Sequence, residues 1–147
     1  MTLPEIQELA RVEEVLESRW PETKIEPSLD RISHLMTLLG DPQFAYPVIH
    51  ITGTNGKTST ARMIESLLRS MGLRTGLVTS PHLHQVTERI RLNGEPIPAG
   101  KFVEIYDELE PYLAIVDNES LASGGPAMSY FEVLTGMAFA AFADAPV

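Results

Sequence analysis

A short apolar run leads directly into a loop that contains two glycines, a lysine and three hydroxyl side chains. The run is Val48–Ile51, and the loop reads Gly53-Thr54-Asn55-Gly56-Lys57-Thr58-Ser59. An amphipathic helical pattern begins immediately behind the loop. Proteins build nucleoside-triphosphate sites from this order of strand, loop and helix, because glycines let backbone N–H groups approach phosphates and the helix N-terminus adds partial positive charge. The sequence therefore predicts an α/β fold with a phosphate-binding site at this junction.

Within the loop, Lys57 is the residue that we expect to be catalytic, because its ammonium group can reach the β- and γ-phosphates. The hydroxyl of Thr58 or Ser59 can face a magnesium ion, and the sequence leaves open which one does. A strict P-loop has a glycine five positions before Gly56, where this chain has Ile51. The alternative is a plain glycine turn with an exposed lysine. We favour the phosphate site because both glycines, the lysine and the hydroxyls stand where the chemistry requires them.

Charge and composition exclude several classes of protein. The chain has 147 residues, enough for one domain with a core, and a formal net charge of −9. This charge argues against a nucleic-acid or anionic membrane surface, although it does not exclude ATP. The chain contains no cysteine and no apolar run long enough to cross a membrane, and its acidic N-terminus is unlike a secretory signal. We therefore expect a cytoplasmic protein.

Periodic apolar residues indicate how the rest of the chain is organised. We expect helices over residues 6–16 and 32–39, a strand at 48–51, and a helix after the loop. A second strand at 74–79 is expected to lie parallel to the first, because crossovers are right-handed. Asn93-Gly94 predicts a hairpin turn, and Pro111 is expected to kink or interrupt the helix that follows Pro98. With a final helix over 128–143, the pattern predicts a P-loop α/β domain with a mainly parallel sheet flanked by helices.

The loop after the second expected strand should lie near the phosphate loop, because ligands bind at the carboxyl ends of parallel strands. Ser80 follows the strand directly, so its hydroxyl is a candidate magnesium ligand, or else a turn residue before proline. His82 and His84 lack a third nearby metal ligand, so zinc is disfavoured and packing or hydrogen-bonding roles are expected. Arg89 can pair with a substrate carboxylate or with a surface acid such as Glu88.

Glu132 has two interpretations. It stands three residues after Ser129, as in a capping box, where it would satisfy only an N–H group at a helix end. Alternatively, its carboxylate meets the metal ion. The pattern alone favours the cap.

These motifs together resemble folylpolyglutamate synthase/dihydrofolate synthase, a family of Mur-ligase-like ATP-dependent amide ligases. The resemblance rests on residues 48–57, Thr79-Ser80-Pro81-His82-Leu83, Glu88-Arg89-Ile90 and Tyr130-Phe131-Glu132, and it extends from about Lys24 to the last residue. The family's loop reads Gly-Thr-Asn-Gly-Lys, so Ile51 is no defect there, whereas Thr58 stands where the family often has glycine.

The resemblance implies a two-step ligation. ATP would phosphorylate a carboxylate of dihydropteroate or of a folate glutamate tail, and the amine of L-glutamate would attack the acyl phosphate. It implies Mg²⁺ with Ser80, Glu132 and Thr58 as ligands, which shifts our expectation for Glu132 from the cap toward the metal. The folate site would be shaped by Pro81, His82, Leu83 and Arg89, and less certainly by residues 26–32.

Family members are several times longer than this chain, and they carry a further histidine metal ligand, adenine-binding residues and a C-terminal glutamate-binding domain. We therefore expect residues 1–147 to be the N-terminal part of the ATP-binding domain, inactive alone and prone to self-association, with a monomeric parent enzyme. Two alternatives are a Mur-type cell-wall ligase and a non-catalytic P-loop nucleotide-binding module. The sequence does not distinguish dihydrofolate synthesis from polyglutamate extension, nor does it specify the folate form or the tail length.

Overall fold

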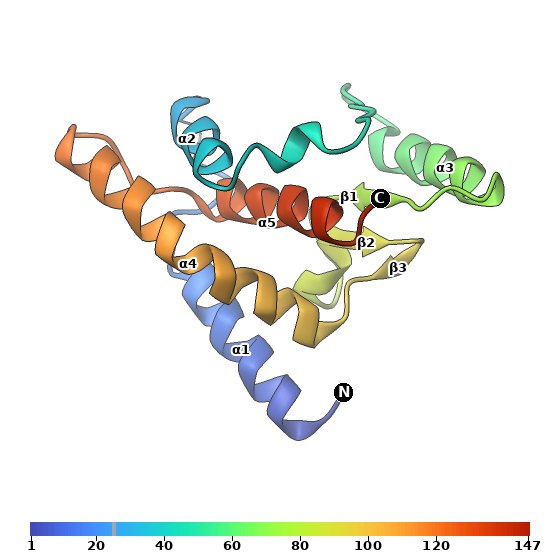
Figure 1. Ribbon diagram of the computed structural model, residues 1–147, viewed down its shortest axis with the longest axis horizontal. Helices are drawn as coiled ribbons and strands as arrows, with labels where there is room; N and C mark the ends of the chain where they lie inside the picture. The colour runs from blue at the N-terminus through green and yellow to red at the C-terminus, as the bar shows by residue number, and fades with distance from the viewer. Residues whose placement is uncertain (25) are drawn as a thin grey trace.

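A computed structural model, which describes residues 1–24 and 26–147, places four helices against one another around a shared apolar core (Figure 1). These helices are α1 (Leu3–Glu17), α2 (Asp30–Leu38), α4 (Ala99–Ala122) and α5 (Tyr130–Asp144). The core is built from the inward faces of these helices, and α5 lies in the middle of the group. The largest fully buried side chains of this core include Phe102, Tyr106, Leu16 and Met137.

The helix ends follow local sequence signals. Thr2 accepts a hydrogen bond from the backbone of Glu5, whose side chain reaches back to Thr2, and this capping box begins α1. Leu9, Val12 and Leu16 are buried at helical spacing, as the periodicity predicts. The first and second expected helices are therefore confirmed.

The helix α4 differs from its expected form, because it continues through Pro111 without interruption. Proline removes a hydrogen bond to the carbonyl four residues earlier, which is that of Asp107. Both residues are exposed, so water can solvate the freed carbonyl. Between residues 1 and 147, leaving out 25, no helix is long and apolar enough to cross a membrane.

A small sheet packs beside this helical group. Its strands are β1 (Gly76–Val78), β2 (Ile90–Leu92) and β3 (Glu95–Pro96), paired antiparallel in the order β1-β2-β3. Asn93 and Gly94 both have positive φ, as a two-residue type I′ turn requires, and this confirms the hairpin. The α/β class is likewise confirmed.

The parallel pairing expected for residues 48–51 and 74–79 is not formed. Residues 48–51 have no strand structure, and Val48 and Ile49 are 57% and 60% exposed. A parallel strand is stable where both of its faces are covered and a neighbour accepts its hydrogen bonds. Within the described residues no strand pairs with this segment, so its β-branched, apolar composition alone does not make it a strand.

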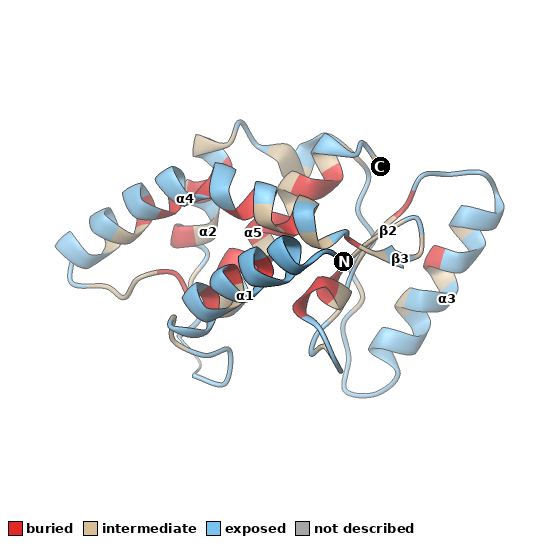
Figure 2. Ribbon diagram, turned by 90° about the horizontal axis from the view of Figure 1, so that it is seen from below, coloured by how far each residue is buried: buried red, intermediate tan, exposed pale blue. Residues whose placement is uncertain are grey.

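The helix α3 (Lys57–Ser70) stands apart from the other helices and joins the molecule beside β1 (Figure 1). Most of its surface is exposed (Figure 2). Apolar residues recur at helical spacing along this helix, yet Met63, Leu67 and Met71 are 60%, 65% and 74% exposed, whereas Ile64 and Leu68 are half-buried. The apolar face of α3 is thus broader than the part of the helix that β1 covers. Two short 3₁₀ helices, η1 (Pro42–Phe44) and η2 (Val86–Arg89), complete the described secondary structure.

Candidate functional site

The phosphate loop owes its shape to two glycines with positive φ. Gly53 has a φ of 143° and Gly56 a φ of 74°, conformations that other residues rarely adopt. Gly56 is the N-cap of α3 and supplies no side-chain cap, so the helix begins without a side-chain acceptor for its first N–H groups. The ammonium group of Lys57 donates a hydrogen bond to the carbonyl of Gly53, which folds the side chain over the loop.

An open depression connects this loop with the end of β1. It has a volume of about 280 Å³ and is lined by Thr54, Gly56, Lys57, Thr58, Ser59 and Ser80. This volume lies just below the roughly 300–1,000 Å³ of sites that enclose whole ligands, and it suits a phosphate chain. The structure therefore brings Ser80 to the phosphate loop, as the position of Ser80 after a strand predicts. Asn55 lies within the same loop.

The donors at this depression fit a magnesium ion chemically. Thr58, Ser59 and Ser80 contribute hydroxyl oxygens, and all three residues are exposed. Magnesium prefers hard oxygen ligands and retains several waters, so a few hydroxyls plus phosphate oxygens form a suitable set. Among residues 1–24 and 26–147, no group of three histidine, cysteine or acidic side chains is placed to hold a metal ion.

Glu132 does not line this depression. Its carboxylate accepts hydrogen bonds from Arg31 at 3.1 Å and 3.2 Å, and from the backbone N–H of Ser129 at 2.7 Å. The hydroxyl of Ser129 in turn accepts from the backbone of Glu132, which completes the capping box of α5. Both carboxylate oxygens are thus engaged in a helix cap and a nearly buried ion pair. The role of Glu132 as a metal ligand stays a prediction, and it would require the carboxylate to leave Arg31.

Arg31 is held from several sides. Its guanidinium lies 5.6 Å from the ring centre of Trp20, and Trp20 donates to the carbonyl of Ala127 at 2.6 Å. The side chains of Arg31 and Glu132 are 9% and 13% exposed, so the pair is largely removed from water. Arg31 comes from the segment 26–32, which the family resemblance places beside the substrate.

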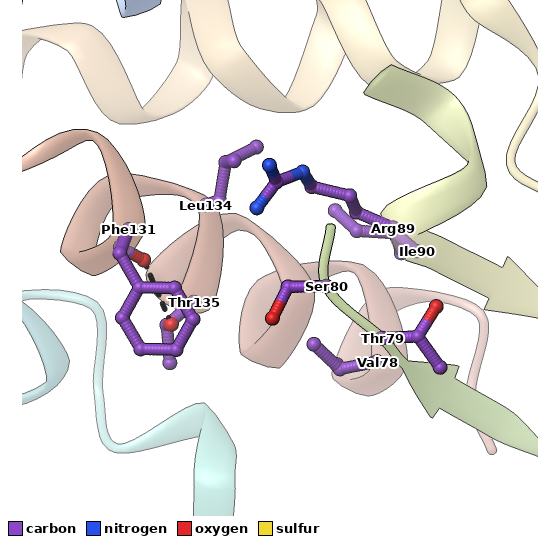
Figure 3. Close-up of a pocket in the computed structure, with 8 residues that line it drawn as sticks. All are labelled: Val78, Thr79, Ser80, Arg89, Ile90, Phe131, Leu134 and Thr135. Carbon is purple, nitrogen blue, oxygen red and sulfur yellow. Dashed lines mark hydrogen bonds between the residues drawn. The ribbon is translucent and has the colours of Figure 1, made fainter. Parts of the chain in front are cut away.

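Ser80 also faces a small crevice between the sheet and α5 (Figure 3). Ser80 lies at the end of β1, opposite Phe131 and Thr135 of α5. Thr135 donates to the carbonyl of Phe131 at 2.8 Å. The Ser80–Pro81 peptide bond is cis. Residues of α5 thus line one side of the crevice beside Ser80, and Glu132 is not among them.

Arg89 is buried and fully engaged. Its guanidinium binds both carboxylate oxygens of Glu22 at 3.1 Å and 3.2 Å, donates to Nδ1 of His82 at 2.9 Å, and lies 5.1 Å from the ring centre of Tyr130. Burial raises the pKa of the Tyr130 hydroxyl, although the charge of Arg89 opposes this. The contact with Glu22 confirms that Arg89 pairs with a surface acid, although this acid is not Glu88. Arg89 thereby ties the loop to the N-terminal segment, and its pairing with a substrate carboxylate stays a prediction.

Glu88 organises the loop between Ser80 and Arg89. Its carboxylate accepts backbone hydrogen bonds of 3.0 Å each from Leu83, Gln85 and His84. These bonds, with those from Leu83 and Gln85 the largest contributions, lower the pKa of Glu88 to about 2. Leu83 is 82% exposed at the tip of this ordered loop. The ring of His82 accepts from Arg89, which confirms the hydrogen-bonding role expected for His82. His84 is held through its backbone N–H, by Glu88, and the role of its side chain stays a prediction.

Sequence reasoning missed the residues that support the site. Glu22 and Arg31 bind partners 67 and 101 residues away along the chain, and no local pattern marks either of them. Glu88 had a usable signal, because it stands three residues after Gln85 at the start of η2, in the spacing of a capping box.

Comparison with known proteins places this geometry in context. Residues 51–95 match the model of the Mur ligase middle domain. The dihydrofolate synthase/folylpolyglutamate synthase of Mycobacterium tuberculosis is 59% identical over 149 aligned residues, which cover 99% of this chain and 31% of that protein.

Solved structures agree with the sequence matches. The folylpolyglutamate synthase of Mycobacterium tuberculosis, solved in complex with ADP, matches 97% of this chain with a TM-score of 0.91 and 57% identity. The folylpolyglutamate synthase of Thermotoga maritima matches 95% of this chain with a TM-score of 0.85 and 42% identity. The chain spans 31% of the length of each of these two structures.

Proposed function

We propose that the chain belongs to the folylpolyglutamate synthase/dihydrofolate synthase family of Mur ligases, and that the whole protein is an ATP-dependent ligase that joins L-glutamate to dihydropteroate, to folate glutamate tails, or to both. One observation carries the proposal. The phosphate loop and Ser80, which lie on different elements, meet at one depression of a size that suits a phosphate chain. An ADP complex of a protein 57% identical to this chain supports the same ligand class.

In this proposal, the loop 53–59 binds the triphosphate of ATP. Backbone N–H groups and the N-terminus of α3 face the phosphates, and Lys57 moves from the Gly53 carbonyl to a phosphate oxygen. Charge that develops on the transferred phosphoryl group is stabilised by these fixed donors. Lys57 is therefore the catalytic residue of this part of the protein.

A magnesium ion would be held here by the hydroxyl of Ser80 and that of Thr58 or Ser59, with phosphate oxygens and waters completing its shell. When bound, the ion neutralises negative charge on the phosphates. The carboxylate of Glu132 would be a further ligand in this proposal, and it would have to exchange its bonds with Arg31 for the ion.

The reaction conserves its atoms in two displacements. A carboxylate oxygen of the folate substrate attacks the γ-phosphorus, the bond to the β-phosphate oxygen breaks, and ADP leaves. The amine nitrogen of L-glutamate then attacks the acyl carbon, releases phosphate, loses a proton and forms the amide. Exclusion of water from the acyl phosphate would protect it from hydrolysis between these steps.

The loop after Ser80 is the proposed folate-facing surface. Pro81 and Leu83 are exposed next to the depression, where an apolar ring system can contact them. His82 and Arg89 act on the substrate indirectly, because their mutual hydrogen bond fixes the shape of the loop.

We propose that residues 1–147 form the front of the ATP-binding domain and that the glutamate-binding domain is supplied by other parts of the whole protein, which acts as a cytoplasmic monomer. The isolated chain is then inactive as a ligase. Its exposed apolar residues on α3 and at 48–49 favour self-association. Robust glutamate-dependent ATP hydrolysis by the isolated chain would contradict this assignment.

Thermal unfolding with added ligands tests the proposed function. In the whole protein, Mg·ATP with dihydropteroate or tetrahydrofolate should raise Tm beyond the effect of Mg·ATP alone, because a ligand that binds only the folded state stabilises it. A response to UDP-linked muramic compounds would favour a cell-wall ligase instead. A response to nucleotide alone would favour a non-catalytic binding module.

A further inference from the structure

The helix that carries Lys57 is attached to the sheet through a buried carboxylate. Of the residues in α3, all of which are described, only Glu65 is buried, at 7% exposed. Its Oε1 accepts a hydrogen bond from the hydroxyl of Thr75 at 2.6 Å and another from Nε of Arg69 at 3.0 Å. A buried carboxylate is uncommon unless such partners satisfy it, so this contact is specific.

Thr75 is itself fixed to the hairpin. Its backbone N–H donates to the side chain of Asn93 at 3.0 Å, and its carbonyl accepts from the backbone N–H of Asn93 at 2.8 Å. The side chain of Arg69 covers Gly94 in the same turn, where an added Cβ would lie 2.8 Å from the guanidinium carbon. We call Glu65, Arg69, Thr75 and Asn93 the polar latch.

The polar latch joins the middle of α3 to the start of β1, and the beginning of α3 and the residues after β1 form the proposed phosphate site. Glu65 is eight residues beyond Lys57, a distance of about 12 Å along a helix. Thr75 immediately precedes β1, and Ser80 follows β1. Lys57 and Ser80 line one depression, so the spacing between the two elements decides how far the loop lies from the serine hydroxyl.

Apolar packing does not provide this attachment by itself. The outer stripe of α3 is exposed at Met63, Leu67 and Met71, and the sheet covers only a narrow face of the helix. A charge-assisted hydrogen bond in a buried position is stronger and more directional than partial apolar contact. We propose that Glu65 is a positioning residue for nucleotide binding, which acts through Thr75 to hold the phosphate loop at Ser80. This inference rests on the proposed function of the loop.

Substitution of Thr75 tests the proposal with little change in volume. Thr75→Val removes the hydroxyl donor, whereas Thr75→Ser retains it and should rescue the effect. Binding of Mg·ATP to the 147-residue chain is measured by calorimetric titration, and amide hydrogen exchange of residues 53–60 is measured without nucleotide. We expect Thr75→Val and Glu65→Gln to weaken Mg·ATP binding about tenfold and to accelerate exchange in the loop, and Thr75→Ser to stay within about twofold of wild type.

A matched control separates positioning from loss of stability. Ile105 is buried in α4 away from the loop, so Ile105→Val should destabilise the chain without changing Mg·ATP affinity or loop exchange. The proposal is overturned if Thr75→Val and Glu65→Gln bind and exchange like wild type, or if Ile105→Val lowers affinity as much as they do. If the wild-type chain binds no Mg·ATP, the nucleotide proposal fails, and loop exchange alone then decides whether the polar latch positions the loop.

Discussion

Replacing Glu132 by glutamine should destabilise the chain strongly, because it leaves the buried charge of Arg31 without a counter-ion. The two side chains are 9% and 13% exposed, Arg31 donates to both carboxylate oxygens through Nε, and a terminal nitrogen of Arg31 lies 3.0 Å from Oε1 of Glu132. Removal of one partner from such a pair costs about 3 kcal/mol. The glutamine oxygen can still accept from Ser129, so this variant isolates the loss of charge from the loss of the helix cap.

The expected loss is measured as the free energy of unfolding in urea, followed by circular dichroism. At about 2–4 °C per kcal/mol for a chain of this size, Tm should fall by about 6–12 °C. Glu132→Ala should cost about 1 kcal/mol more, because it also removes the cap. The double variant Arg31→Met/Glu132→Leu should recover most of the loss, since no charge then stays buried.

Glu104→Gln is the matched control, because Glu104 forms an exposed pair with Lys101 and its loss should change stability by less than about 0.5 kcal/mol. The reasoning is refuted if Glu132→Gln unfolds like wild type and instead loses only magnesium-dependent nucleotide affinity. That result would support Glu132 as a metal ligand.

Three further outcomes follow from the contacts. Glu88→Gln should accelerate amide hydrogen exchange at residues 83–85, because it removes the charge that accepts their hydrogen bonds. In wild type, the pKa of this carboxylate is lowered from 4.5 to about 2. The protection of these amides should therefore be complete above about pH 4.5 and lost as pH falls through about 2. Gly76→Ala should destabilise by about 1–3 kcal/mol in urea unfolding, because its Cβ would lie 2.6 Å from the buried ring of Phe142. Leu67→Glu should lower the sedimentation-average mass of the isolated chain if the exposed face of α3 mediates self-association, and an unchanged mass would exclude that face.

The proposed phosphate site could be located from the sequence because its determinants are local. Gly53, Gly56 and Lys57 lie within five residues, and their positions between an apolar run and a helix specify both backbone shape and charge. The approach of Ser80 followed from a general rule for α/β proteins, which places residues that follow strands near the ligand. The serine reaches the loop although the strand before it pairs antiparallel with β2.

The partners of buried charges could not be predicted, because they depend on tertiary contacts. Arg89 has an acidic neighbour at Glu88 in the sequence, yet Glu88 turns toward backbone N–H groups and Arg89 binds Glu22. Glu132 satisfied a local capping pattern, and its second partner, Arg31, comes from α2. The local capping patterns of Glu88 and Glu132 were correct, whereas distant residues determined the ion pairs of Arg89 and Glu132.

The strand expected at 48–51 illustrates a different limit. Its composition favours a strand, but a strand also needs a neighbour that accepts its hydrogen bonds. Val48 and Ile49 are exposed in the described structure, so their preference for β structure does not lead to a strand here. The apolar stripe of α3 shows the same limit of sequence-based prediction. Periodicity predicts which residues share a helix face, but it does not predict whether another element covers that face.

Titration of the chain with Mg·ATP, for wild type and for Lys57→Ala, tests the central claim most directly. Loss of a charge-assisted hydrogen bond to a phosphate should weaken binding by about 10- to 100-fold. Lys101→Ala serves as the control, because Lys101 pairs with Glu104 and Asp144 away from the depression. Equal affinity of wild type and Lys57→Ala for Mg·ATP would contradict the assignment of the loop 53–59 as the phosphate site.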